Sequence, residues 1–182
     1  MRDLAAFPTG LPAAPKACLP ENLRLRLARR VDLPFLLALY GSVRAPELQG
    51  CSWPQCRQEA FITDQFRLQH THYLRAYSTA DYWVVDRIEP DGAWVSIGRL
   101  SLDRSSRDWH LIELSLVAIE RGRGRGTALI RWVQRAGAVA SADSVGLHVA
   151  RDNPGAIRLY ARMGFRRVPS HFSTHARLCW TP

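Results

Sequence analysis

An arginine–glycine run between a strand pattern and a helix pattern constrains the fold of this chain more than any other segment. The apolar alternation of Trp109–Val117 predicts a strand, the run Arg121-Gly-Arg-Gly-Arg-Gly126 follows it, and Thr127–Ala136 has the pattern of a helix. Glycines let a ligand approach the backbone closely, and the unpaired N–H groups at a helix start bind anions. We therefore expect an α/β fold in which the glycine turn binds a pyrophosphate.

The remaining apolar periodicity predicts one α/β domain with a mixed sheet. The expected strands are Leu23–Leu27, Trp83–Glu89, Ala93–Asp103, Trp109–Val117, Ser144–Val149, Phe165–Pro169 and His175–Trp180, and the expected helices are Leu33–Val43, Pro54–Ala76, Thr127–Ala136 and Pro154–Met163. Asp32 is expected to cap the first helix, and Asp91-Gly92 suits the turn of a hairpin. Residues 1–22 are rich in Ala and Pro, so we expect a flexible or loosely packed arm there and the folded domain over residues 23–182.

The charge of the chain favours an anionic partner without identifying it. Lys and Arg total 25 against 16 Asp and Glu, the formal net charge is +9, and Lys16 is the only lysine. Arginine suits bidentate phosphate binding, although an arginine bias also arises from genome composition. No window approaches the roughly 18 consecutive apolar residues of a membrane span, and the proline-rich N-terminus lacks the apolar core of a secretion signal. We therefore expect a cytoplasmic protein that does not enter a membrane.

The four cysteines predict no metal site. Cys51 and Cys56 flank four residues, and His70 and His72 lie nearby, but this spacing matches none of the usual zinc patterns. We expect reduced, partly buried thiols instead.

The glycine run departs from several other motifs that bind phosphates or nucleic acids. A P-loop requires Gly-Lys-Ser/Thr, and the run has no lysine. A dinucleotide fingerprint requires GxGxxG, but the last position falls on Thr127 or Leu129. RG-rich nucleic-acid tracts are usually longer and lie outside folded elements. The pattern that the run does meet is Arg-x-x-Gly-x-Gly, at Arg121, Gly124 and Gly126.

A second segment, residues 147–165, combines the end of a strand with a well-delimited helix. Asn153 is a suitable N-cap, Pro154 occupies the first helical position, and Gly164 is placed to end the helix with a positive φ. One face of this helix carries Ala156, Leu159, Tyr160 and Met163. Such a face suits either core packing or contact with a ligand.

Together the two segments resemble the GNAT superfamily of acetyl-CoA-dependent N-acetyltransferases. The first matches that family's Arg/Gln-x-x-Gly-x-Gly/Ala signature between the fourth strand and the third helix. The second matches its strand, Asn, Ala, Leu-Tyr, Gly-Phe pattern, at Asn153, Ala156, Leu159-Tyr160 and Gly164-Phe165. The resemblance implies a single-domain GNAT-like fold over residues 23–182, with a mixed, mostly antiparallel sheet of about seven strands flanked by about four helices.

The resemblance also implies that acetyl-CoA is the co-substrate. The fourth and fifth strands would separate, and backbone groups of Leu116 and Val117 would hold the pantetheine between them. The pyrophosphate would lie on the turn formed by Arg121, Gly122, Arg123, Gly124, Arg125, Gly126 and Thr127. Asn153 and Tyr160 would face the cofactor, and the Tyr160 hydroxyl would be the general acid that protonates the leaving thiolate.

Three residues are candidates for the general base that deprotonates the amine: Glu113, His110 and His148. Glu113 ranks first because a carboxyl group in an otherwise apolar segment is suited to a raised pKa, although pairing with Arg99 is the alternative. His110 lies three residues earlier, so a regular strand would place it on the opposite face. His148 lies on the fifth strand, where similar proteins place a carboxylate. Deprotonation of the amine through a chain of water molecules, without any single side chain as base, is a further alternative.

The acceptor is expected to contact the parts of the chain that are least typical of the family. These are the loop Gly41–Trp53, the loop Pro169–Thr174, and a helix face with Gln65, Phe66, Gln69 and Tyr73. Acidic residues are sparse there, which argues against a polycation. An amino acid, a small metabolite amine and a peptide N-terminus remain open.

The sequence therefore predicts an N-acetyltransferase that moves an acetyl group from acetyl-CoA to a primary amine by direct transfer in a ternary complex. One alternative is a basic nucleic-acid-binding module, which leaves the segment Asn153–Phe165 unexplained. The other is a catalytically silent acyl-CoA-binding protein, against which the intact Tyr160 counts. The aromatic content is compatible with a homodimer without requiring one.

Overall fold

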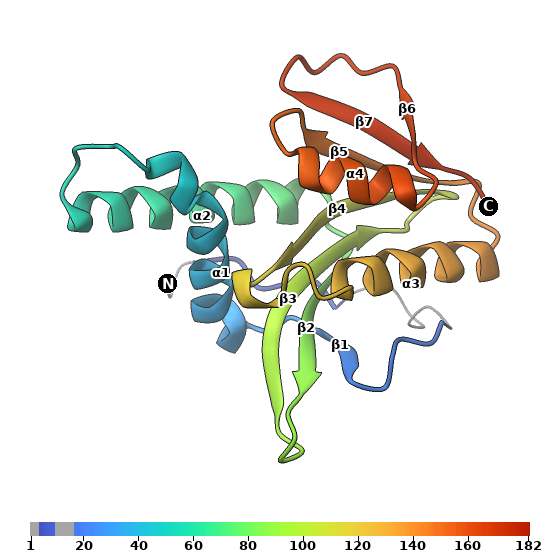
Figure 1. Cartoon of the computed structure of the whole chain (residues 1–182), viewed down its shortest axis with the longest axis horizontal. Helices are drawn as coiled ribbons and strands as arrows, with labels where there is room; N and C mark the ends of the chain where they lie inside the picture. Colours follow the sequence, from blue (N-terminus) through green and yellow to red (C-terminus); the bar gives the residue numbers. More distant parts are fainter. Residues whose placement is uncertain (1–3, 10–16) are drawn as a thin grey trace.

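The computed structural model describes residues 4–9 and 17–182, which form one seven-stranded sheet with helices on both faces (Figure 1). The strands are β1 Leu23–Leu27, β2 Asp81–Ile88, β3 Trp94–Asp103, β4 Asp108–Leu116, β5 Ser144–Ala150, β6 Arg166–Val168 and β7 His175–Trp180, and the helices are α1 Leu33–Arg44, α2 Gln55–Ala76, α3 Arg125–Val139 and α4 Pro154–Arg162. Across the sheet the strands lie in the order β1-β2-β3-β4-β5-β7-β6. Each expected helix and strand is present, so the predicted architecture is confirmed.

Each face of the sheet packs against a different pair of helices. On one face, Leu129 of α3 and Tyr160 of α4 join a buried core with residues of β3, β4 and β5. On the other face, Leu36 of α1 and Phe66 of α2 pack with Val84 of β2. We name these the α3/α4 face and the α1/α2 face. None of the helices within the described residues has the length and apolarity needed to cross a membrane.

Strands β4 and β5 pair along only part of their length. They run parallel, and their register joins Asp108–Leu111 to Ser144–Leu147. β4 continues to Leu116 and β5 to Ala150 without further pairing between them. Every other neighbouring pair of strands in the described sheet is antiparallel. The two parallel strands therefore separate beyond their paired segments, as the sequence resemblance implies.

Strand β4 contains one extra residue relative to its neighbour β3. Glu113 opposes Ser101, but the next β3 residue opposes Leu111, so Ile112 has no partner and forms a β-bulge. A bulge shifts the alternation of side chains by one residue, so His110 and Glu113 lie on the same face of the sheet. The expectation that they face opposite sides is wrong, because it assumed a regular strand.

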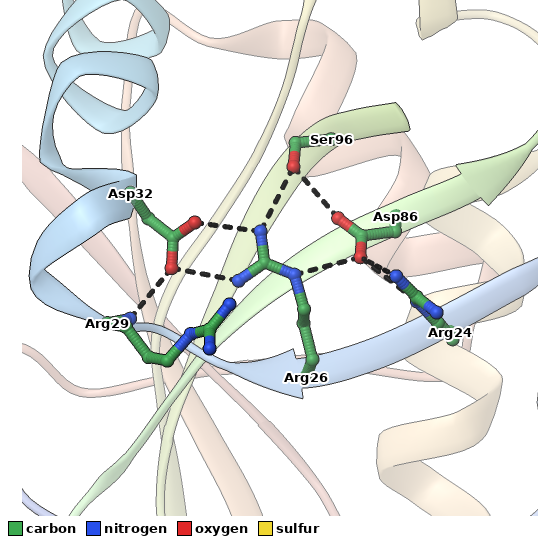
Figure 2. A network of polar contacts seen from close by, with 6 residues as sticks. All are labelled: Arg24, Arg26, Arg29, Asp32, Asp86 and Ser96. Atoms are coloured by element: carbon green, nitrogen blue, oxygen red, sulfur yellow. Dashed lines mark hydrogen bonds and ion pairs between the residues drawn. The ribbon is translucent and has the colours of Figure 1, made fainter. Parts of the chain in front are cut away.

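A buried carboxylate network ties β1, β2 and the start of α1 together (Figure 2). Asp86 of β2 accepts hydrogen bonds from Nε of Arg24 at 3.0 Å and from Nε of Arg26 at 2.9 Å. The guanidinium of Arg26 also donates to both carboxylate oxygens of Asp32, each at 2.8 Å. Asp32 further accepts from the backbone N–H of Arg29 and does not cap α1. The predicted capping role of Asp32 is wrong, because a charged guanidinium is the stronger partner for its carboxylate.

The N-terminal segment contacts both faces of the sheet along its described residues. Leu4 is buried, and the ring of Phe7 lies 5.0 Å from the ring of His70, edge to face. His70 also hydrogen-bonds to a backbone carbonyl of this segment at 3.0 Å. Further along, Nε1 of Trp132 in α3 donates to the carbonyl oxygen of Ala17 at 2.9 Å. The segment expected to be a flexible arm is thus packed where it is described; residues 1–3 and 10–16 lie outside the described part.

Replacing Asp86 by alanine is expected to lower the free energy of unfolding by about 2–4 kcal/mol, because Arg24 and Arg26 lose the buried carboxylate between them. Chemical denaturation followed by circular dichroism measures the change. The matched control is Asp143→Ala, which removes a carboxylate paired with Arg107 on the surface and should leave the denaturation midpoint unchanged. Equal effects of the two substitutions would contradict a structural role for the Asp86 network.

Candidate functional site

The glycine run forms an open turn at the start of α3. Gly122 and Gly124 have φ angles of +73° and +78°, a left-handed conformation that other residues rarely adopt. A Cβ atom on either glycine would meet no other atom within 4 Å, so the space over both is open. No hydrogen bond within the described chain engages the backbone N–H groups of Gly122, Arg123, Gly124 or Arg125. This group of N–H donors at a helix start fits a phosphate.

The three arginines of the turn differ in their surroundings. Nε of Arg125 lies 2.6 Å from the carboxylate of Glu120, which is 4% exposed and also pairs with an arginine of β2. Arg121 donates from Nε to the carbonyl oxygen of Leu116 at 2.9 Å. Arg123 is exposed and has no ion pair among the residues that the structure describes. The charge of Arg123 is therefore free to meet a phosphate, whereas Arg125 supports the turn through Glu120.

Several backbone groups at the end of β4 already form hydrogen bonds within the chain. The N–H of Val117 donates to a carbonyl of β3 at 2.9 Å, and the Val117 carbonyl accepts from the N–H of Glu120 at 3.0 Å. The carbonyl of Leu116 accepts from Arg121. Because β4 loses its pairing with β5 earlier, the open edge of this strand begins at Ile112, upstream of the two residues expected to contact pantetheine.

Helix α4 lies beside the turn, and its two ends are built as the sequence predicts. Oδ1 of Asn153 accepts from the N–H of Ala156 at 3.0 Å, and Gly164 ends the helix with a φ of +82°. A Cβ atom on Gly126 would come within 3.4 Å of Cδ2 of Leu159. The start of α3 therefore lies against α4, at a distance that would still admit a Cβ atom.

Tyr160 of α4 is held on the α3/α4 face. Its side chain is buried, and its ring lies 5.5 Å from the ring of Phe165. Burial raises the pKa of Tyr160 to about 12, so the phenol stays protonated at neutral pH. No described residue forms a hydrogen bond with this hydroxyl, so its proton is available to a ligand.

A cavity of about 250 Å³ lies on the α1/α2 face, where β4, β5 and β7 are neighbours. Its walls include His110 of β4, His148 of β5, Arg177 of β7 and the loop between β6 and β7. The ring centres of His110 and His148 are 5.4 Å apart. His110 stacks on Tyr77 at 5.8 Å, and His148 meets Phe172 edge to face at 5.2 Å. The cavity thus brings together two of the three candidate bases and one of the loops expected at the acceptor site.

The surroundings of both histidines favour the neutral imidazole. Burial lowers the pKa of His110 below its ordinary value of 6.5, and His148 lowers it further, while Asp103 opposes this shift. Burial also lowers the pKa of His148, and the positive charges of Arg177 and His175 add to the effect. An unprotonated imidazole can accept a proton at neutral pH. The histidine pair therefore meets the first requirement for a general base.

Glu113 lies on the same face but in an ion pair. Its Oε2 lies 3.3 Å from Nη1 of Arg99, and the hydroxyl of Ser115 donates to Oε1 at 3.1 Å. Arg99 is buried, so Glu113 neutralises a positive charge that would otherwise be unpaired in the interior. Glu113, ranked first as base from the sequence, thus forms the ion pair with Arg99 that was its alternative role, whereas neither histidine has such a partner among the described residues.

The other residues expected at the acceptor site do not line this cavity. Phe66 is buried in the core of the α1/α2 face, and Trp53 packs against Phe61 near the start of α2. Sequence reasoning missed Tyr77 and Arg177. Arg177 reaches the cavity because it opposes His148 in the register of β5 and β7. The alternation of polar and apolar side chains along β7 is the sequence pattern that could have placed Arg177 on the cavity face of the sheet.

The sequence profile of the acetyltransferase (GNAT) family matches residues 45–165. Among curated proteins, none matches the chain in sequence.

Solved structures of low sequence identity share the fold. The PaiA N-acetyltransferase of Thermoplasma acidophilum, in complex with coenzyme A, has a TM-score of 0.65 at 14% identity, over 88% of this chain and 99% of that one. An acetyltransferase of Thermus thermophilus has a TM-score of 0.61 at 18% identity, over 91% and 100% of the two chains. The spermidine N-acetyltransferase of Vibrio cholerae, in complex with CoA and spermine, has a TM-score of 0.57 at 19% identity, over 89% and 96%.

Two arginine-to-glutamine substitutions in the turn are expected to have different effects. Arg125→Gln should lower the free energy of unfolding by about 2–3 kcal/mol, because Glu120 is left buried with one partner fewer. Arg123→Gln should change stability by less than about 0.5 kcal/mol, because Arg123 is exposed. Only Arg123→Gln should weaken coenzyme A binding in the folded protein. Thermal unfolding and calorimetry measure the two quantities, and the reverse pattern would contradict the assigned roles.

Proposed function

The chain belongs to the acetyltransferase (GNAT) family, and from this premise we propose that it moves an acetyl group from acetyl-CoA directly to a primary amine in a ternary complex. Enzymes of this family are acyltransferases with acetyl-CoA as co-substrate. One observation carries the proposal. Strands β4 and β5 separate from each other. The glycine turn with its free N–H groups and Tyr160 lie on one face of the sheet at this opening, and the histidine pair lies on the other face.

On the donor side, the residues present fit acetyl-CoA. The free N–H groups of the glycine turn would bind the pyrophosphate, and Arg123 would supply a counter-charge. The edge of β4 that opens at Ile112 would bind the pantetheine, with the acetyl thioester between the two strands. Leu116 and Val117 would lie downstream of this point, where both of their carbonyls and the N–H of Val117 are already bonded within the chain. Tyr160 would donate its proton to the leaving sulfur, and burial keeps the phenol protonated before the thiolate forms.

On the acceptor side, His148 is the proposed general base, with His110 beside it as the second imidazole. His148 is the first β5 residue beyond the segment paired with β4, so it adjoins the point where the strands separate. It would accept the proton that the ammonium loses. The amine nitrogen would then form a bond to the acetyl carbon, the C–S bond would break with its electrons on sulfur, and Tyr160 would protonate that sulfur. The second proton that the nitrogen loses as the amide forms would return to the Tyr160 phenolate, directly or through water.

The competing proposals differ in what they require. Glu113 as base would have to be released from Arg99, which is buried and would lose its partner. A silent acyl-CoA-binding protein would need neither the Tyr160 hydroxyl nor the histidine pair. A nucleic-acid-binding module would make no use of the separated strands.

Binding of desacetyl coenzyme A tests the donor side. We expect micromolar binding by calorimetry, lost in Gly124→Glu, because the new side chain would enter the open space over the turn and repel phosphate. The matched control is Gly92→Glu, since Gly92 also has a positive φ of +84° and open space around it but lies in the β2–β3 hairpin. Absence of binding at millimolar concentration by the wild-type protein would overturn the proposed function.

Tyr160→Phe separates chemistry from binding. This substitution should leave the affinity for coenzyme A within about twofold and lower kcat by about a hundredfold, since only the donated proton is removed. Release of free thiol from acetyl-CoA in the presence of an amine measures kcat. Full activity of Tyr160→Phe would contradict the role of general acid.

The pH dependence of kcat tests the histidine pair. Because the pKa of His110 and that of His148 lie below 6.5, kcat should hold through neutral pH and fall on acidification with a midpoint below 6.5. The titratable groups that face the pair are Tyr77, Asp103, His171, His175 and Arg177. His148→Gln should lower kcat by about a hundredfold and remove this acidic limb. An unchanged limb in both His148→Gln and His110→Gln, with activity lost in Glu113→Gln, would identify Glu113 as the base instead.

A further inference from the structure

The described residues that line the cavity around the histidine pair include one arginine, Arg177, and no carboxylate. Resting on the proposed function, we propose that the acceptor is a small α-amino acid with an apolar side chain, and that Arg177 binds its carboxylate. This assigns a substrate class to the acceptor site and a specificity role to Arg177.

The charge of the cavity wall points to an anionic group on the ligand. The titratable residues that line it are His110, His148, His171 and Arg177, and none of the lining residues is Asp or Glu. Asp103 acts on His110 from β3 but accepts a hydrogen bond from the backbone N–H of Ser105. A planar guanidinium matches a carboxylate in a bidentate arrangement.

Arg177 has no competing partner in the described structure. It is exposed at the cavity wall, and neither an ion pair nor a hydrogen bond to a described residue engages its guanidinium. Other arginines that face the α1/α2 side from the sheet, such as Arg26 and Arg99, are paired with carboxylates. Arg177 therefore keeps its full charge for a ligand.

The spacing of Arg177 and His148 fits an amine and a carboxylate on one carbon. The two residues are directly opposed in the antiparallel register of β5 and β7. Side chains opposed in this way begin about 4.5–5.5 Å apart at Cβ. An α-amino acid bound with its carboxylate on Arg177 would present its amine to the neighbouring His148, next to the opening between β4 and β5.

The remaining wall suits a small apolar side chain. Phe172 is 58% exposed although it is aromatic, and it stands edge to face with His148 at the cavity. Pro169 lies in the same loop and also lines the cavity. The volume of about 250 Å³ lies below the roughly 300–1,000 Å³ of pockets for drug-sized ligands, so it favours a compact acceptor.

A polyamine is a poor match for the same wall. A polycation gains affinity from carboxylates and is repelled by an unpaired guanidinium. The fold is shared with the spermidine N-acetyltransferase of Vibrio cholerae, but the cavity wall of this chain includes arginine and histidine and no acidic residue.

A matched panel of acceptors tests the assignment. L-Phenylalanine and 2-phenylethylamine differ only in the carboxylate, as do L-leucine and 3-methylbutylamine, and spermidine represents the polycations. With acetyl-CoA, kcat/KM for each amino acid should exceed that for its decarboxylated partner by about ten- to a hundredfold, the range of a charge-assisted hydrogen bond. Thiol release measures turnover, and calorimetry with the coenzyme A-loaded enzyme measures binding of each acceptor separately.

Substitutions of Arg177 then test whether this residue causes the preference for acceptors with a carboxylate. Arg177→Gln should abolish the ratio of kcat/KM between each amino acid and its decarboxylated partner, and Arg177→Lys should restore part of that ratio. The control is Arg167→Gln, because Arg167 is an exposed arginine of β6 that opposes Leu178 and so points away from the cavity face.

The outcomes separate this inference from the proposed function. Failure of coenzyme A to bind overturns both. Coenzyme A binding with faster turnover of the decarboxylated amines or of spermidine overturns only the carboxylate assignment. The same holds if amino acids neither bind nor react, or if Arg177→Gln keeps the wild-type preference.

Discussion

The separation of β4 from β5 is the constraint on which the whole candidate site depends. Their parallel pairing ends at Leu111, and the next residue of β4 is the bulged Ile112. A bulge bends and twists its strand, which gives a physical reason for the two strands to separate at this point. Beyond the bulge, Leu114 and Leu116 continue the core of the α3/α4 face, while Glu113 turns to the buried Arg99. The extra residue thus lies where the sheet opens, and it changes which face of the sheet the following side chains of β4 occupy.

The arginines divide between structure and ligand binding according to their partners. Arg125 and Arg99 are paired with the carboxylates of Glu120 and Glu113, and these pairs hold the turn and the strand in place. Arg123 and Arg177 have no such partners within the described chain and lie at the turn and at the histidine cavity. Because only an unpaired guanidinium offers its full charge to a ligand, we assign these two to the donor and the acceptor.

Local patterns in the sequence predict the elements and the ends of α4, because periodicity, the Asn153 cap and the Gly164 terminus depend on neighbouring residues alone. The predictions from sequence are wrong where a residue far away in the chain determines the local structure. Asp32 binds Arg26 of β1 instead of capping α1. The face of His110 depends on a bulge that only the pairing with β3 reveals. The described residues of the N-terminal segment contact both helical layers, and its Ala/Pro-rich composition gives no sign of these contacts.

A crystal structure of the protein with coenzyme A tests the central claim most directly. The account predicts the pyrophosphate on the backbone N–H groups of residues 122–125, the pantetheine between β4 and β5, and the sulfur between Tyr160 and His148. Coenzyme A bound elsewhere on the surface, or strands β4 and β5 paired along their full length in the complex, would contradict it.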